Sequence, residues 1–184
     1  MNRLLAAVDR HVTLRQLLWL VPCLLALHNA EEALTMPQWV MANLPLIRDA
    51  LPWKVELTFS PGQLIASVAV ATVIPFGVAL FGAAGRADTR RALPLILIQA
   101  VVLLNAFIPH LYLSLRFLRY NPGMVTATLL NIPFSLYFFR RLLAEKALTR
   151  RELLWSFIVA AVSYPAIAWL LHESGEFIAR LTSA

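Results

Sequence analysis

The chain has 184 residues, of which 60% are hydrophobic and only 14% are charged, and its mean hydropathy is +0.70. Soluble domains are usually about half apolar and about a quarter charged, so this composition excludes an ordinary soluble domain and indicates an integral membrane protein. The formal charge is +6, but the basic residues stand at the ends of apolar runs. That placement favours membrane topology and lipid headgroups, and we expect no nucleic-acid partner. Cys23 is the only cysteine, which excludes an intrachain disulfide.

The predicted fold is all-α, a polytopic membrane helix bundle that forms one transmembrane domain over residues 1–184. A hydrocarbon core about 30 Å thick needs about 20 residues of helix, and about five runs fit that length. In chain order the predicted spans are 17–34, 64–81, 92–113, 124–139 and 153–171. The basic amino terminus resembles a secretory signal, but His28-Asn29-Ala30-Glu31-Glu32 stands where a cleavage site is expected. We therefore interpret the first run as a retained helix.

The segment from Thr35 to Pro61 is the only long loop in this prediction. Its apolar residues recur at roughly helical spacing: Met36, Trp39, Val40, Leu44, Ile47 and Leu51. We expect a short interfacial helix in this first outer loop, interrupted at Pro45. An interfacial connector is the simpler interpretation, and a lid over a site is the alternative.

Basic residues in the flanks predict the orientation in the membrane. With the amino terminus inside, the outer flanks hold only Arg48, Lys54, Arg116, Arg119 and Arg180. The inner flanks hold all the others: Arg3, Arg10, Arg15, Arg86, Arg90, Arg91, Arg140, Arg141, Lys146, Arg150 and Arg151. We therefore predict a multi-pass protein of the cell membrane, the inner membrane of a bacterium, with a cytoplasmic amino terminus and an external carboxyl terminus.

The first predicted span contains an unusual group of ionisable residues. Its apolar run from Leu17 to Leu27 covers about 16 Å at 1.5 Å per residue, which is half of a membrane. The helix must therefore carry His28, Glu31 and Glu32 through the outer half, where each charge costs up to about 2.5–3.5 kcal/mol. At 100° per residue the three side chains project into one arc. A compensating partner is expected, unless the helix ends at His28 and the acids lie in water.

The third predicted span supplies partners at a similar depth. Asn105 and His110 lie about 20 and 27 Å from its start. Pro109 has no N–H, so the carbonyl of Asn105 loses its usual donor and the helix is expected to kink there. This kink would turn His110 relative to Asn105. An ordinary proline kink, with His110 at the interface, is the alternative.

These residues carry a resemblance to a known family. His28-x-x-Glu31-Glu32, then Asn105 with His110, then Tyr120-x-Pro122-Gly123-x-x-Thr126 resemble the HXXEE-motif family of small prokaryotic membrane proteins, over roughly residues 16 to 172. The function of this family is unassigned. The resemblance implies that the functional residues are His28, Glu31, Glu32, Asn105 and His110.

A second polar group ends the fifth predicted span. His172 and Glu176 are four residues apart and therefore share one helix face. They form half of a metal-binding pattern, without the second histidine of the usual zinc-peptidase order. A solvated helix end is the simpler interpretation, and we keep His172 and Glu176 as secondary candidates.

Two kinds of chemistry would compensate the charges of the first span. A divalent metal would take His28, His110, Glu31 and Glu32 as ligands, zinc fitting best and iron or manganese suiting a set richer in carboxylates. Without a metal, one glutamate would stay protonated and act as a general acid.

The leading prediction is a metal-dependent membrane enzyme acting on a lipid-like or amphipathic small molecule, and hydrolysis is the natural reaction if the metal is zinc. Glu31, Glu32 and Asn105 are the predicted catalytic residues, while Tyr120 and Thr126 would line the outer mouth. The alternatives are a metal-free acid–base isomerase or cyclase of an apolar substrate, a proton- or cation-coupled transporter, and a structural subunit. Membrane lipids surround the protein, and a homo-oligomer is compatible with the sequence.

Overall fold

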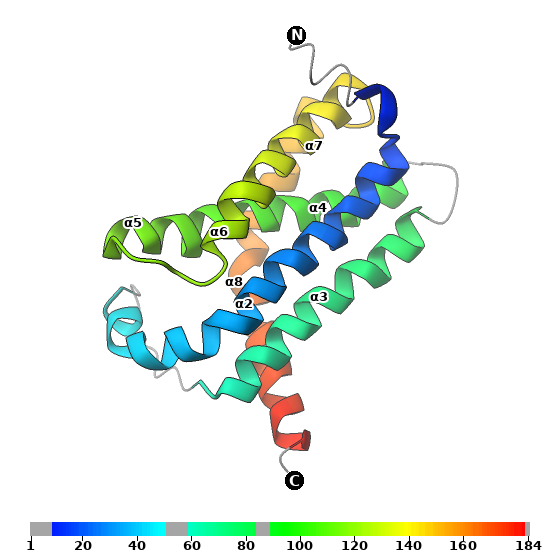
Figure 1. Ribbon diagram of the computed structural model, residues 1–184. Helices are drawn as coiled ribbons and strands as arrows, with labels where there is room; N and C mark the ends of the chain where they lie inside the picture. Colours follow the sequence, from blue (N-terminus) through cyan, green and yellow to red (C-terminus); the bar gives the residue numbers. More distant parts are fainter. Residues whose placement is uncertain (1–8, 51–58, 84–88, 183–184) are drawn as a thin grey trace.

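The computed structural model describes residues 9–50, 59–83 and 89–182, and these ranges contain helices but no strand (Figure 1). The all-α prediction is thereby confirmed. In chain order the elements are α2 (Leu14–Ala50), α3 (Pro61–Ala83), α4 (Thr89–Asn105), the π-helix η1 (Ala106–Tyr112), α5 (Leu113–Phe117), α6 (Met124–Thr126), the π-helix η2 (Ala127–Asn131), α7 (Ile132–Ala144) and α8 (Arg150–Thr182).

Four helical segments in the described ranges are long and apolar enough to cross a membrane: Leu14–Asp49, Pro61–Phe81, Ala92–Phe117 and Arg150–Thr182. The fifth predicted span, 124–139, is helical as well, through α6, η2 and α7, but it is not one of these four. A polar residue of this segment, the buried Ser135, connects it to α4, because it accepts a hydrogen bond from Gln99 (2.6 Å). Bonds of this kind hold helices together in a membrane. A fifth crossing stays a prediction.

The helix α2 does not end near Leu34, as the first predicted span does. It continues through the expected loop to Ala50, with one non-helical residue, Asn43 (φ −120°, ψ 15°). The side-chain amide of Asn43 donates to the carbonyl of Trp39 (2.8 Å), and Pro45 has no N–H to continue the helical pattern. The interruption thus lies two residues before Pro45. Leu51, the last residue of the predicted apolar pattern, lies outside the described residues.

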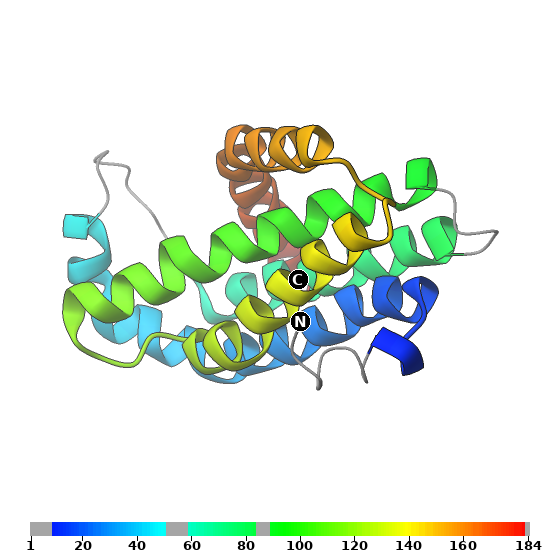
Figure 2. The same cartoon turned by 90° about the horizontal axis from the view of Figure 1, so that it is seen from above.

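The bundle places α8 across the other long helices. α3 lies beside α2 and α4, while α8 crosses α3 and α4 on the side away from α2 (Figure 2). The contact between α8 and α3 is close at Gly175, where a Cβ atom would lie only 2.5 Å from the carbonyl oxygen of Gln63. A residue without a side chain is therefore required at this crossing.

The apolar core and the two buried histidines occupy different parts of the bundle. The core gathers residues from the first half of α2, from α3, α4 and α7, from the connection before α8 and from α8 itself: Leu17, Leu18, Val21, Ala79, Ala92, Leu95, Ile96, Ala100, Leu103, Phe138, Phe139, Leu142, Leu148 and Ala160. The buried polar residues His28, His110 and Asn121 lie instead where the middle of α2 meets η1 and the connection before α6. This polar region is the candidate site.

Candidate metal centre

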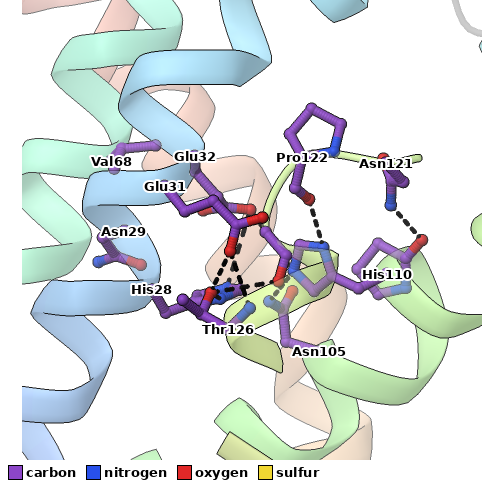
Figure 3. Close-up of polar contacts among 12 residues, drawn as sticks. His28, Asn29, Glu31, Glu32, Val68, Asn105, His110, Asn121, Pro122 and Thr126 are labelled. Carbon is purple, nitrogen blue, oxygen red and sulfur yellow. Dashed lines mark hydrogen bonds and ion pairs between the residues drawn. The ribbon is translucent and has the colours of Figure 1, made fainter. Parts of the chain in front are cut away.

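Three side chains from two elements converge at the centre of the polar region. His28 and Glu32 are one turn apart on α2, and His110 belongs to η1. The Oε1 atom of Glu32 lies 3.9 Å from Nε2 of His28 and 3.4 Å from Nε2 of His110. The two imidazole rings meet edge to face, with centroids 4.8 Å apart. One donor atom from each residue lies within 4.8 Å of the others, as a shared metal ion requires. Figure 3 shows this arrangement.

Hydrogen bonds fix which nitrogen of His28 is free. Nδ1 lies 2.9 Å from the hydroxyl oxygen of Thr126, and that hydroxyl donates its proton to Oε2 of Glu31 (2.6 Å). The hydroxyl must therefore accept a hydrogen bond from Nδ1–H, so Nε2 of the neutral ring carries the lone pair. Nε2 is buried and has no hydrogen-bond partner. An orphaned polar atom of this kind costs about 1–3 kcal/mol, unless an ion binds it.

Glu31 lies beside the three donors but is occupied by other contacts. Its carboxylate accepts hydrogen bonds from the backbone N–H groups of Thr126 (2.8 Å) and Val125 (3.3 Å) and from the hydroxyl of Tyr120 (2.8 Å). These N–H groups begin the helix that starts at α6, where a helix has unpaired donors and a partial positive charge. Glu31 therefore caps that helix and orients His28 through Thr126. It is not one of the three converging donors.

The π-helix η1 brings His110 and Asn105 to the same side. In an α-helix, residues five apart are separated by about 140° around the axis, whereas the i→i+5 repeat of a π-helix places them one above the other. Pro109 lies inside η1 and lacks the N–H that an α-helical pattern would use. Nδ2 of Asn105 donates to Nε2 of His110 (2.8 Å), and Nδ1 of His110 donates to the carbonyl of Pro122 (2.7 Å). Nε2 of His110 therefore also carries a lone pair.

Tyr164 of α8 extends this chain of hydrogen bonds. Its hydroxyl donates to Oδ1 of Asn105 (2.7 Å), which fixes the Asn105 amide with its N–H groups toward His110. The sequence analysis did not select Tyr164, because a lone tyrosine in an apolar run has no motif around it.

Gly123 covers the three donors from the connection before α6. Its φ angle is +78°, and a Cβ atom there would lie 2.7 Å from the Cε1 atom of each imidazole and 3.0 Å from Cγ of Glu32. The absence of a side chain is therefore what lets His28, His110 and Glu32 approach each other beneath this loop. Gly123 stood in the predicted motif without an assigned role.

The separations suit a metal ion better than they suit direct hydrogen bonds. Donors at about 2.0–2.1 Å from a tetrahedral zinc ion are about 3.3–3.4 Å from each other. The His110–Glu32 separation is 3.4 Å, and the His28–Glu32 separation of 3.9 Å needs only a small adjustment. Hydrogen bonds between such groups are shorter, about 2.5–3.2 Å. Two imidazoles and one carboxylate are also a known donor set for catalytic zinc.

Tyr120 and Thr126 lie next to the site, as expected for residues at its mouth. The hydroxyl of Tyr120 binds Glu31 and also lies 3.2 Å from the hydroxyl of Thr35. The backbone carbonyl of Tyr120 accepts a hydrogen bond from the indole N–H of Trp39 (2.8 Å). Burial raises the pKa of the Tyr120 hydroxyl, so this group stays protonated and keeps donating to Glu31. Tyr120 and Thr126 thus act through Glu31 and His28.

The secondary candidates His172 and Glu176 form a separate group on α8. With Glu173 they bring donor atoms within 4.8 Å of one another, at partly or fully exposed positions. His172 is hydrogen-bonded to the amide of Gln63 (3.0 Å), and Glu176 pairs with Arg180. These groups therefore already have partners, unlike Nε2 of His28.

The fold and the site together define a polytopic, all-α membrane protein with a buried histidine–glutamate cluster. The chain belongs to the family described as "protein of unknown function with HXXEE motif", whose model matches residues 19–138. It is 24% identical over 153 residues to the uncharacterized protein YrkK of Bacillus subtilis (strain 168). The aligned region covers 83% of this chain and 90% of that protein. No solved structure matches the chain. The resemblance inferred from the three motifs is therefore confirmed.

Proposed function

We propose that the protein is a metal-dependent membrane enzyme that acts on an amphipathic or lipid-like substrate. His28, Glu32 and His110 would hold the metal, and zinc fits this donor set best. Such an ion polarises a substrate oxygen or activates a water molecule for hydrolysis. The set differs from the sequence prediction in that Glu31 orients a ligand instead of binding the ion.

One observation carries this proposal: two buried imidazole nitrogens and the partly buried carboxylate of Glu32 face one another, and the nitrogen of His28 has no proton donor. The Nε2 atom of His28 has no partner at all, and Glu32 lies within 3.4 and 3.9 Å of the two ring nitrogens. A cation would relieve the repulsion among these lone pairs in a region of low dielectric constant. The supporting side chains Thr126 and Glu31 resemble the outer shell that orients histidine ligands in metalloproteins.

The surroundings of the site support an amphipathic substrate. The Glu32 side chain remains 17% exposed, whereas that of His28 is 1% exposed, so the centre is accessible from the side of Glu32. The two elements that meet at Tyr120 also carry exposed leucines, Leu34 on α2 and Leu118 after α5. A substrate would place its polar group at Glu32 and keep its acyl or prenyl chain in the hydrocarbon around the helices.

Metal analysis of the detergent-purified protein tests the proposal. We expect one zinc ion per chain in the parent protein and loss of most of that metal in His28→Gln, Glu32→Gln and His110→Gln. The matched controls are His11→Gln, at an exposed position before α2, and His172→Gln, in the separate group on α8. Both should keep their metal.

Two outcomes would contradict the proposal. One is a parent protein without stoichiometric metal, and the other is a metal content that follows His172 instead of His28. Once a turnover assay on a lipid-like ester exists, activity that survives chelators but disappears in Glu32→Gln would support the metal-free acid–base enzyme in place of the metalloenzyme.

A further inference from the structure

Asn105 occupies the lone pair that His110 would offer to a metal. Its Nδ2 lies 2.8 Å from Nε2 of His110, while its Oδ1 accepts from the hydroxyl of Tyr164 at 2.7 Å. An amide N–H and a metal ion cannot use the same lone pair of an imidazole at the same time. Binding of an ion to His110 therefore requires the Asn105 amide to move.

A rotation of the amide by about 180° satisfies every group in this chain of contacts. The rotation exchanges the positions of Oδ1 and Nδ2. The oxygen then lies near the ion, and the N–H group points at Tyr164. A tyrosine hydroxyl both donates and accepts hydrogen bonds, so the hydroxyl of Tyr164 accepts from the rotated amide without moving its oxygen. Each nitrogen and oxygen atom of this chain then keeps a partner.

The position reached by the oxygen is that of a neighbouring ligand. It would lie where Nδ2 lies now, 2.8 Å from Nε2 of His110. Two donors at about 2.05 Å from one tetrahedral ion are about 3.3–3.4 Å apart, so a shift of about 0.5 Å brings the oxygen to that separation. Asn105 and His110 are held in this relation by the π-helix η1, so the relation does not depend on a flexible loop.

We propose that Asn105 is an exchangeable fourth ligand of the centre, and that Tyr164 is the positioning residue that stabilises both orientations of its amide. This inference rests on the proposed metal site. A neutral amide oxygen binds zinc more weakly than a carboxylate or an imidazole does. A substrate oxygen can therefore displace Asn105 while His28, Glu32 and His110 retain the ion.

Cobalt(II) replacing zinc provides a test that does not depend on activity. The parent protein should bind one cobalt ion with the intense visible bands of four-coordinate cobalt. Asn105→Leu keeps three ligands, so it should still bind one ion, but about 10–100-fold more weakly and with shifted bands, because water replaces the amide oxygen. Asn105→Asp has no N–H to cap His110 and offers an anionic oxygen. It should bind at least as tightly as the parent and keep the intense bands.

The Raman doublet of tyrosine reports whether its hydroxyl donates or accepts a proton, and thus tests the role of Tyr164. Metal binding should shift one tyrosine from donor to acceptor in the parent protein, and this shift should be missing in Tyr164→Phe and in Asn105→Leu.

Several results would overturn the inference. Asn105→Leu with the parent's cobalt affinity and spectrum, or an unchanged tyrosine signal on metal binding, would overturn it alone and leave the metal site intact. Absence of bound cobalt from the parent and every variant would overturn the proposed function as well.

Discussion

Thr126 is the residue through which the two glutamates of the motif acquire different roles. Its hydroxyl and its backbone N–H both donate to Glu31, and the same hydroxyl accepts from Nδ1 of His28. Glu31 is thereby engaged by α6, whereas Glu32, one residue later, faces the two imidazoles. Adjacent residues on one helix thus serve as a helix cap and as a proposed metal ligand.

Replacing Thr126 by valine should weaken metal binding without removing a ligand. The substitution keeps the shape of the side chain but removes the acceptor that holds His28 in the required tautomer. We expect a zinc affinity about 10–100-fold lower, as for other residues that orient ligands. Thr126→Ser should restore the affinity. Isothermal titration of the metal-free variants measures the effect, and an affinity of Thr126→Val equal to that of the parent would contradict this role.

Gly123→Ala should disturb the same centre from the opposite side. The left-handed backbone at Gly123 (φ +78°) costs a residue with a Cβ atom about 1–2 kcal/mol, and the new methyl group would overlap both imidazole rings. We expect a lower thermal unfolding temperature together with weaker zinc binding. Gly77→Ala is the control, because it has no atom within 4 Å of the new Cβ and replaces a helical glycine. It should be neutral or stabilising by about 0.5–1 kcal/mol. Equal behaviour of the two variants would contradict the account.

Some of these contacts could be predicted from the sequence, because they depend on helical periodicity. The spacing of His28 and Glu32 places them on one face, and the structure brings both to the centre. The role of Glu31 could not be predicted in this way, since its partners Val125 and Thr126 are far along the chain. Tyr164 could not be predicted as a site residue for a related reason: it contacts Asn105 only because α8 crosses α4.

At the scale of the elements, the two π-helices lie where the site is formed. η1 contains His110, and η2 begins directly after Thr126. The proline at position 109 predicted a disturbed helix, but a proline in a helix can produce a kink, a break or a widened turn. The choice of a π-helix depends on tertiary contacts such as the bond from Asn121 to the carbonyl of Pro109 (2.8 Å). Those contacts cannot be read from the sequence around Pro109.

The crossing of α3 and α8 is an element-scale contact that can be tested separately from the site. In Gly175→Ala the new methyl group would meet the carbonyl oxygen of Gln63 at 2.5 Å and the backbone nitrogen of Ser67 at 2.9 Å. Overlap with backbone forces the helices apart, and we expect a destabilisation of about 1–3 kcal/mol. In the control, Gly62→Ala, the methyl group would lie 3.8 Å from Cβ of Ala179, an ordinary contact. Thermal unfolding in detergent distinguishes the two variants, and an unchanged Gly175→Ala would show that the crossing is looser than described.

Asp9 connects the segment before α2 to α7 and predicts a dependence of stability on pH. Its carboxylate accepts from Arg140 (2.8 Å) and Tyr137 (3.0 Å) and pairs with Arg141 (2.8 Å). The hydrogen bonds from Arg140, aided by Arg141 and Tyr137, lower the pKa of Asp9 from 3.8 to about 2. Because the folded state has the lower pKa, this contribution to stability is complete above about pH 4 and disappears as the pH falls through about 2.

Thermal unfolding at pH 6 and pH 3 measures this effect. The parent protein should lose more stability between the two values than Asp9→Asn does, because the amide of the variant does not titrate. An identical loss in both proteins would contradict the contribution of Asp9.

At the scale of the whole molecule, the predicted fold class and family are confirmed, while the topology in the membrane stays a prediction. The start of α2 and the end of α8 lie at opposite ends of the molecule (Figure 1). The predicted cytoplasmic amino terminus depends on the distribution of basic residues. The division of the bundle into an apolar core and a polar region was foreseeable in outline, because ionisable residues inside a span need partners.

The central claim is that two imidazoles and one carboxylate bind a single ion within the bundle. X-ray absorption of the zinc-loaded protein tests it most directly. The account predicts a first shell of nitrogen and oxygen donors at about 2.0–2.1 Å, together with the outer-shell scattering of two imidazole rings. A sulfur donor, or the scattering of fewer than two imidazoles in the parent protein, would contradict it.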